Sequence, residues 1–226
     1  MHLLTTQLGT VSYAIALELQ RDLARRRIAG EIDEDLLLLL EHPPVVTLGR
    51  TAKEAHIISS PERLRARGIE VHEVERGGDV TFHGPGQLVG YPIFDLKRHR
   101  QDLHWYLRQV EEALIVALGE VGIEAERNSG YTGVWTRGRK IASIGVHARD
   151  WVTWHGFALN VTTDLSYFDL IVPCGIPQVQ MTSVARELGT DFTMDRMSAV
   201  VARAFGEVFA LEPREAARAM LEPVPR

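Results

Sequence analysis

The single cysteine of the chain, Cys174, stands between Pro173 and Gly175. A lone cysteine is most often a small buried hydrophobe, but proline and glycine on either side indicate an irregular turn from which a side chain can project into a cleft. A nucleophilic cysteine must also be a thiolate, which requires a nearby cation, an imidazole or a helix N-terminus. The sequence does not choose among the candidate suppliers, which are His83, His147, His155 and Lys140.

Lysine is scarce in this chain. The 25 basic residues include only Lys53, Lys97 and Lys140 as lysines, and the others are arginines. A lysine can release its proton in a protein whereas an arginine cannot, so each lysine is a candidate for a titrating role. For any one of the three, chance is the simpler explanation.

A glycine-rich stretch, Arg76 to Gln87, reads Arg-Gly-Gly-Asp-Val-Thr-Phe-His-Gly-Pro-Gly-Gln. Glycines beside a strand allow the backbone to approach a ligand closely and to present amide groups to a carbonyl or an anion. The simpler alternative is a tight hairpin bend with a satisfied histidine. The stretch is not a nucleotide-binding motif, because it lacks the Gly-x-Gly-x-x-Gly spacing at the start of a helix.

Composition limits the classes of function. With 226 residues, of which 45% are hydrophobic and 24% charged, the chain is expected to form one domain over residues 1–226. A formal net charge of −5 argues against a general nucleic-acid binder. The N-terminus has no basic stretch before an apolar core, and the longest apolar run, Leu36 to Leu40, is too short to span a membrane. We therefore expect a cytoplasmic protein, and a single cysteine fits a reducing compartment.

Apolar spacing predicts three main helices. Ile15, Leu19 and Leu23 recur every fourth residue between Thr10 and Arg27 and predict a helix with these three side chains on the core. A second helix is predicted from Leu103 to Val121, with Asp102 capping its start and Gly122 its end, and a third follows Thr193. From Leu211 onwards we expect a short helix and a frayed end.

Short apolar or alternating runs predict the strands. They are Leu36 to Leu40, Val45 to Leu48, Val80 to Phe82, Gln87 to Phe94, Val134 to Thr136, Lys140 to Val146 and Val152 to Val161. Arg137-Gly138-Arg139 is a hairpin link between two of them. Because helices and strands do not alternate regularly, we predict an α+β fold with a mixed β-sheet and flanking helices.

Arg76 to Gln87, continued by Tyr91-Pro92-Ile93, resembles the signature of the lipoyl(octanoyl) transferase family. Further blocks that resemble this family are His42 to Arg50, Gly133-Val134-Trp135, Lys140 to Val146, His155 to Val161, Pro173 to Ile176 and Thr182-Ser183-Val184. Together they cover about Leu37 to Leu188 in order. Phe82, Ile144 and Phe157 depart from the residues common in the family, and we expect that they reshape an acyl pocket.

The resemblance implies a catalytic domain like that of the biotin and lipoate protein ligases. It implies that Cys174 attacks an octanoyl thioester and that Lys140 stabilises the thiolate and passes protons. It also implies an acyl pocket that supplies backbone donors to the oxyanion. The pocket residues would be Arg76, Gly77, Gly78, Asp79, Val80, Thr81, Phe82, His83, Ser143, Ile144, Gly145, Gly156, Phe157 and Ala158.

The implied donor is octanoyl-acyl carrier protein, and the implied acceptors are lipoyl domains of 2-oxoacid dehydrogenase complexes and the glycine cleavage H protein. We predict no cofactor, and the histidine spacing indicates no metal site. An ATP-dependent lipoate or biotin ligase would need no nucleophilic cysteine. A non-catalytic acyl- or carrier-binding relative would not be expected to retain both Cys174 and Lys140. Nothing in the sequence resembles a dimerisation element, which favours a monomer.

An acidic carrier protein requires a positive surface on an enzyme of net charge −5. Two basic clusters could provide it, Arg137 with Arg139 on the predicted hairpin, and Lys97 to Arg100. We favour the hairpin because it leads directly into Lys140. The alternative is that both clusters are ordinary solvated loops.

Overall fold

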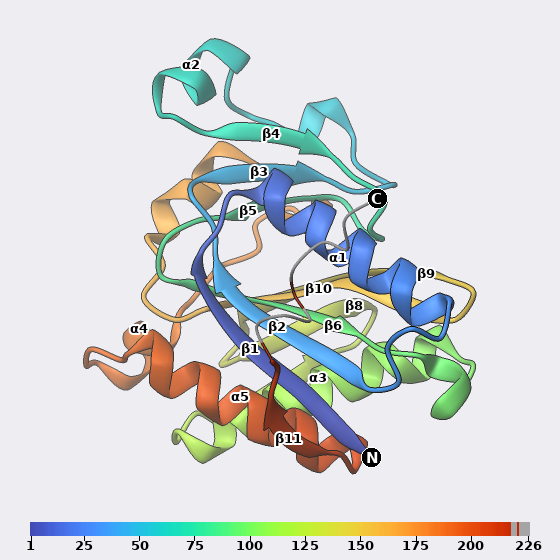
Figure 1. The fold of residues 1–226 in the computed structure, drawn as a ribbon. Coiled ribbons are helices and arrows are strands. Elements are labelled where there is room, and N and C mark those ends of the chain that lie inside the picture. Colours follow the sequence, from blue (N-terminus) through green and yellow to red (C-terminus); the bar gives the residue numbers. More distant parts are fainter. Residues whose placement is uncertain (218–220, 222–226) are drawn as a thin grey trace.

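The computed structural model describes residues 1–217 and residue 221, and within them a large sheet forms the centre of the molecule (Figure 1). This sheet has eight strands in the order β11-β1-β2-β6-β10-β9-β8-β7 among the described residues. The strands are β1 (His2–Thr10), β2 (Asp35–Glu41), β6 (Gln87–Ile93), β7 (Glu126–Asn128), β8 (Tyr131–Thr136), β9 (Arg139–Arg149), β10 (Val152–Asn160) and β11 (Glu212–Glu215).

The large sheet is mixed. Strand β1 runs parallel to both β2 and β11, whereas all the pairs from β2 through β6, β10, β9 and β8 to β7 are antiparallel. A mixed sheet with helices that do not alternate with its strands is an α+β fold, so the prediction of fold class is confirmed.

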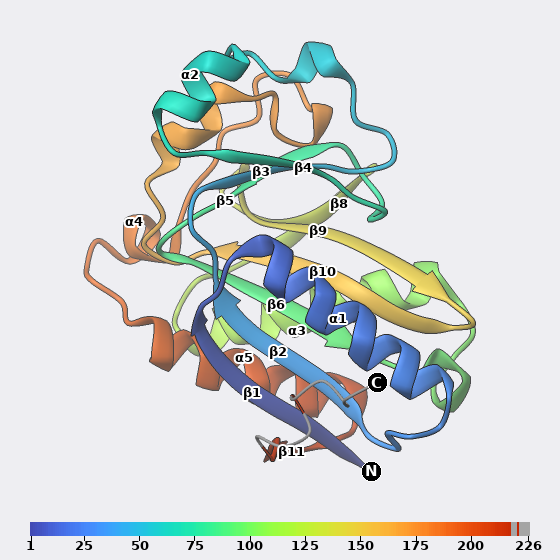
Figure 2. The same cartoon turned by 45° about the horizontal axis from the view of Figure 1, so that its top comes forward.

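Helices cover both faces of the large sheet (Figure 2). Helix α1 (Tyr13–Ile28) packs on one face, over a core that includes Leu36, Leu38 and Ile93. Helices α3 (Leu103–Glu120) and α5 (Met194–Phe209) pack on the other face, over the larger core. Two apolar layers therefore fix the sheet from both sides, which makes it a rigid base for side chains that project from it.

A second, smaller sheet lies above the large one in Figure 2, and its three described strands have the order β4-β3-β5. Strand β3 (Val45–Leu48) is central, parallel to β4 (Glu70–Glu73) and antiparallel to β5 (Val80–His83). The neighbouring strands β2 and β3 thus belong to different sheets. Shorter elements complete the described fold: α2 (Pro61–Ala66), α4 (Val184–Leu188), η1 (Glu54–His56), η2 (Leu96–Arg98), η3 (Leu165–Leu170) and η4 (Pro173–Gly175).

Helix α1 agrees with the prediction at Leu23, which is buried, and at Leu19, which packs against the core, but not at Ile15. Ile15 is 65% exposed, and its expected place on the core is taken by a stripe that includes two polar side chains, Gln20 and Arg27. Both polar groups have partners inside: Gln20 Oε1 accepts the His155 N–H at 2.9 Å, and Arg27 donates to Asp35 at 3.1 Å. The prediction was wrong for Ile15 because apolar spacing alone does not include buried polar residues that have partners.

The prediction of a helix after Leu211 is also wrong for the residues directly after it. Glu212–Glu215 form strand β11, which pairs with β1. The remainder of the predicted tail, apart from residues 216, 217 and 221, lies outside the described residues. None of the described helices combines the length and the apolar character that crossing a membrane would require.

Candidate active site

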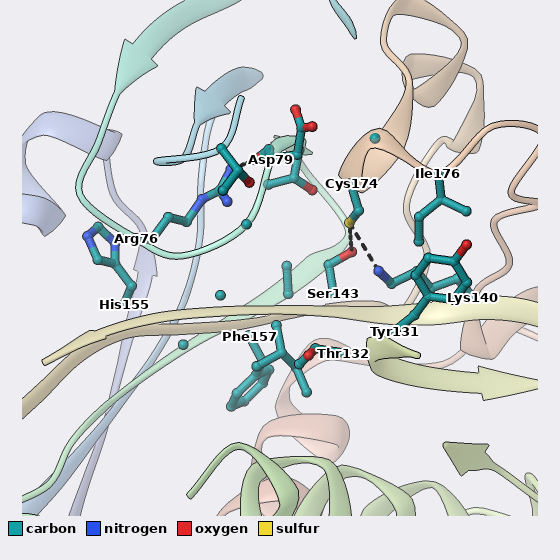
Figure 3. Close-up of a pocket in the computed structure, with 18 of the residues that line it drawn as sticks. Arg76, Asp79, Tyr131, Thr132, Lys140, Ser143, His155, Phe157, Cys174 and Ile176 are labelled. Carbon is teal, nitrogen blue, oxygen red and sulfur yellow. Dashed lines mark hydrogen bonds between the residues drawn. The ribbon is translucent and has the colours of Figure 1, made fainter. Parts of the chain in front are cut away.

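A cavity of about 430 Å³ lies between the two sheets, next to the N-terminal end of α1. Its base is the face of β9 and β10, and the glycine-rich loop before β5 and the turn that carries Cys174 lie across from it (Figure 3). The volume lies within the usual range of small-ligand sites. The cavity brings together residues that are far apart in the sequence, from Tyr13 to Ile176.

Cys174 occupies the middle of the 3₁₀ turn η4, where its φ of 57° is left-handed. A non-glycine residue in that conformation carries backbone strain, and such strain is concentrated at functional sites. The half-buried thiol lines the cavity. The sequence prediction of an irregular turn around Pro173 and Gly175 agrees with this geometry.

Lys140 lies beside the thiol. Its Nζ is 3.0 Å from Cys174 Sγ, and the dashed line in Figure 3 marks this contact. The lysine is only 1% exposed, and its Nζ also lies 4.9 Å from the centre of the Trp135 ring. An ammonium at this distance stabilises a thiolate, and the low exposure protects the pair from competing water.

A bulge in the strand pair β8–β9 aims Lys140 into the cavity. Lys140 and Ser143 are three residues apart, so in a regular strand their side chains would point to opposite faces of the sheet. The pairing shifts by one residue, from Val134 with Ala142 to Trp135 with Lys140. One extra residue on β9 reverses the alternation, and both Lys140 and Ser143 therefore line the same cavity.

Among the four candidate partners of the thiol, the structure places Lys140 in contact with it. Ser143 Oγ is the next polar atom, 3.7 Å from Sγ. His83 instead bonds Gln87 at 2.9 Å, and His147 packs on the ring of Trp154. His155 lines the cavity, but its ring lies near Glu75.

Arg76 holds the glycine-rich loop in place. Its guanidinium is 7% exposed and donates to the carbonyl of Thr47 at 2.8 Å and to the carbonyl of Asp79 at 2.7 Å. It also donates to Thr47 Oγ1 and to the Gly77 carbonyl. Burial lowers the pKa of Arg76. Because most of its donors are already bonded to the chain, the main role of Arg76 is to hold the wall of the cavity in place, and few donors remain for a ligand.

The cavity is lined by most of the pocket residues that the resemblance implied, but not by Gly77, Val80 or Phe82. Val80 and Phe82 alternate with Thr81 along β5, so their side chains point into the core of the small sheet. The Gly77 N–H is already bonded to the Val146 carbonyl at 2.8 Å, so it is not free to bind an oxyanion.

The expected effect of Phe82, Ile144 and Phe157 on an acyl pocket does not match their side-chain positions. Phe82 stacks on Tyr167 with ring centres 4.6 Å apart. Ile144 and Phe157 pack with the core under α3 and α5, and Figure 3 shows the Phe157 ring on the side of the strand away from Cys174. Ile144 and Phe157 can therefore contribute mainly backbone to the cavity.

Four buried tyrosine and histidine side chains gather at the end of the cavity near Arg76. Burial raises the pKa of Tyr13 to about 12, and it raises that of Tyr91 well above its usual value. Burial lowers the pKa of both His83 and His155. These four residues line the cavity, and near neutral pH burial favours their neutral forms.

Sequence reasoning missed several residues that line the cavity. They are Tyr13, Thr51, His56, Gly130, Tyr131 and Thr132. They come from segments without special spacing, and only the packing of the two sheets brings them to the site. Lys53 also lines the cavity, and the scarcity of lysine was the signal that could have indicated it.

The described residues contain no group of three or more His, Cys, Asp or Glu side chains arranged to hold a metal ion. The thiol, the ammonium and the narrow cavity instead form an arrangement that suits acyl transfer through a cysteine.

Comparison with known proteins identifies the family of the chain. Residues 12–206 match the lipoyl protein ligase A/B catalytic domain. The octanoyltransferase of Koribacter versatilis is 53% identical over 207 residues, which cover 89% of this chain and 82% of that protein. The octanoyltransferase of Gloeobacter violaceus is 50% identical over 204 residues, which cover 90% of this chain and 89% of that protein. The chain belongs to the octanoyltransferases of this catalytic-domain family.

Solved structures show the same fold at low sequence identity. A putative lipoate protein ligase from T. acidophilum with bound lipoic acid has a TM-score of 0.79 at 19% identity, covering 96% of this chain and 89% of that one. A lipoate-protein ligase A bound with ATP has a TM-score of 0.78 at 18% identity, covering 95% and 87% of the two chains. The biotin protein ligase of Aquifex aeolicus is more distant, with a TM-score of 0.53 at 13% identity, covering 92% of this chain and 70% of that one. The fold is therefore that of the lipoate and biotin protein ligases.

Proposed function

We propose that this octanoyltransferase moves an octanoyl group from octanoyl-acyl carrier protein to a lysine of a lipoyl domain, through a thioester on Cys174. Residues 1–226 act as one catalytic domain in the cytoplasm, where a free thiol stays reduced. The observation that carries the proposal is the 3.0 Å contact between Lys140 Nζ and Cys174 Sγ inside the cavity.

The first half-reaction follows from this pair. The Cys174 thiolate attacks the thioester carbonyl of the donor, a new carbon–sulfur bond forms, and the bond to the phosphopantetheine sulfur breaks. The Lys140 ammonium gives its proton to the departing thiolate, which leaves Lys140 neutral. One thioester replaces another, so the step requires no ATP.

The second half-reaction regenerates the pair. The neutral amine of the acceptor lysine attacks the acyl-Cys174 carbonyl, an amide forms, one amine proton passes to the neutral Lys140, and Cys174 leaves as a thiolate. The acceptors are lipoyl domains, for which the 2-oxoacid dehydrogenase complexes and the glycine cleavage H protein are the candidates. An ATP-dependent ligase reaction on the same fold would not use the cysteine, so the contact of Cys174 with Lys140 favours transfer.

Intact-mass measurement after mixing with octanoyl-acyl carrier protein tests the proposal. We expect the mass of one octanoyl group to appear on the wild-type protein without ATP, and to disappear when a lipoyl domain is added. Cys174→Ser should fold but fail to transfer, because a serine hydroxyl is not ionised by a neighbouring ammonium near neutral pH. Normal turnover by the serine variant, or modification that requires ATP and free octanoate, would refute the proposal.

A further inference from the structure

The proposed reaction releases more protons than Lys140 can hold. A lysine amine in solution is an ammonium near neutral pH, and it must lose one proton to become a nucleophile and a second to become an amide nitrogen. After the first half-reaction Lys140 is neutral and can accept only one of these two protons. An acceptor that enters the site as an ammonium therefore has one proton that must pass to a second acceptor near the acyl-Cys174 carbonyl, whereas an amine that enters neutral has already lost that proton to water.

His56 and Asp79 form a pair on the other side of the cysteine turn. The His56 Nδ1 lies 2.7 Å from Asp79 Oδ2. A carboxylate can only accept, so Nδ1 carries the hydrogen, and in the neutral imidazole Nε2 is then the nitrogen with the lone pair that a base needs. Across the part of the chain that the structure describes, no hydrogen bond to Nε2 is recorded.

The His56–Asp79 pair contacts the nucleophile turn directly. A Cβ placed on Gly175 would lie 2.5 Å from Asp79 Oδ2 and 3.1 Å from His56 Cε1. The backbone of the two segments is also joined, because the Val172 N–H donates to the His56 carbonyl at 2.7 Å. Figure 3 shows Asp79 and Lys140 on opposite sides of Cys174, so the pair lies on the side of the cysteine turn away from the lysine.

His56 also has access to solvent that Lys140 lacks. Its side chain is 21% exposed, whereas Lys140 is 1% exposed. It lines the reaction cavity and also a second groove that runs along the outer side of the cysteine turn. A base at this position can accept a proton from an entering amine and then release it to water.

We propose that His56, oriented by Asp79, is the general base that takes the second proton of the acceptor lysine. The acceptor ammonium loses two protons in the second half-reaction, of which one returns Lys140 to an ammonium and the other binds His56 Nε2. The carbon–nitrogen bond forms, the bond from the carbonyl to Cys174 Sγ breaks, and the His56 proton leaves to solvent. Asp79 is a positioning residue, because it acts through the imidazole.

This inference rests on the proposed function, and single-turnover kinetics separate the two. Acylation of Cys174 is followed by intact mass with octanoyl-acyl carrier protein, and loss of the octanoyl mass is then followed after adding the lipoyl domain. In His56→Gln we expect acylation within about twofold of wild type and transfer slowed by about 10²-fold or more, the usual contribution of a general base. Asp79→Asn should slow transfer less, because the imidazole remains.

The pH dependence distinguishes a base from a structural clamp. If an imidazole takes the proton, the pH profile of transfer should differ between the wild type and His56→Gln, whereas the pH profile of acylation should not. In His56→Ala, added imidazole should restore part of the transfer rate. His2→Gln is the matched control, because His2 pairs with Glu212 at 3.2 Å on β1 and β11 and does not line the cavity.

Three results would overturn the assignment of His56. Equal losses in acylation and transfer would make the pair a support for the cysteine turn. An unchanged rate of transfer in both His56→Gln and Asp79→Asn would mean that Lys140 and water are sufficient to accept the protons of the acceptor amine. An unaltered pH profile in His56→Gln would exclude imidazole as the base. Failure of wild-type acylation would instead refute the proposed function itself.

Discussion

Cys174 and Lys140 depend on each other in the arrangement that the structure shows. The lysine is almost completely buried and has the cysteine sulfur as its close polar contact, and burying a charge without a partner is costly. The sequence could predict that Cys174 lies on an irregular turn, since proline and glycine flank it. It could not select Lys140 over three histidines, because that choice depends on a contact between residues 34 positions apart.

Lys140→Arg should lower single-turnover acylation by about 10²-fold or more, although the positive charge is kept. A guanidinium cannot release its proton to the departing thiolate, and its larger planar head does not fit the space of an ammonium. The measurement is the rate of octanoyl mass gain with octanoyl-acyl carrier protein. An arginine variant with wild-type rates would show that Lys140 acts only through its charge.

At the scale of elements, periodicity predicted the parts of the fold that bury apolar faces. Helix α3 begins after Asp102, whose side chain accepts two backbone N–H groups as expected of a cap. The Arg137-Gly138 link has positive φ at both residues, as a type I′ hairpin requires. Strands β1, β4, β7 and β11 were not predicted, because they are polar or partly exposed and their pairing partners are mostly distant in the sequence.

Some of the residues that line the site could be predicted from the sequence, and others could not. The glycine-rich loop and the β9–β10 strands could be predicted because their residue types are special. His56 and Tyr13 could not, since an ordinary loop and a helix start contribute them. The bulge that directs Lys140 could not be predicted either. It consists of a one-residue shift between paired strands, and no residue type in the sequence indicates such a shift.

The His42 side chain bonds both the loop before α1 and strand β6. We expect it to make the stability of the fold depend on pH. Its Nδ1 lies 2.7 Å from the Val11 carbonyl, which can only accept, so Nδ1 is the donor and Nε2 accepts from the Tyr91 hydroxyl at 2.7 Å. A proton on Nε2 would reverse that second bond, because the Tyr91 hydroxyl would then have to accept. Burial lowers the pKa of His42 from 6.5 to about 4.

Between pH 6.5 and about 4 the unfolded chain therefore binds a proton at His42 that the folded chain does not. The free energy of unfolding should fall as pH decreases through this window, by on the order of 3 kcal/mol from this residue. Urea unfolding at pH 7 and pH 5 would measure the part of the decrease that falls between these two pH values, about 2 kcal/mol for His42, in the wild type and in His42→Gln. Equal decreases in the two proteins would contradict the assignment.

Across the whole molecule, the net charge of −5 leaves few surfaces that suit an acidic carrier protein. The cluster Lys97 to Arg100 is largely occupied by its own chain: Arg98 donates to the Asp33 carbonyl, and His99 binds Asp35 at 2.6 Å. On the hairpin, Arg139 pairs with Glu187 at 2.9 Å. These pairings weaken the positive potential of both clusters.

Arg137 is the basic residue of the hairpin that remains most accessible. It is 76% exposed and lies 3.9 Å from Glu187, whose carboxylate is 3% exposed and already holds Arg139. Arg139 also lines the groove on the outer side of the cysteine turn. Reversing the charge of Arg139 would leave Glu187 buried without that partner, so a loss of activity in such a variant would report on stability rather than on docking.

Arg137→Glu alone is therefore the sharper test of docking. We expect it to raise the KM for octanoyl-acyl carrier protein about threefold to tenfold at low salt, to flatten the salt dependence, and to leave reaction with a small octanoyl thioester unchanged. Arg100→Glu is the matched control, since Arg100 is similarly exposed and pairs with Asp102 at 3.4 Å. A loss with both donors would mean that Arg137 affects the active site, and a loss in Arg100→Glu alone would move the docking surface to Lys97 through Arg100.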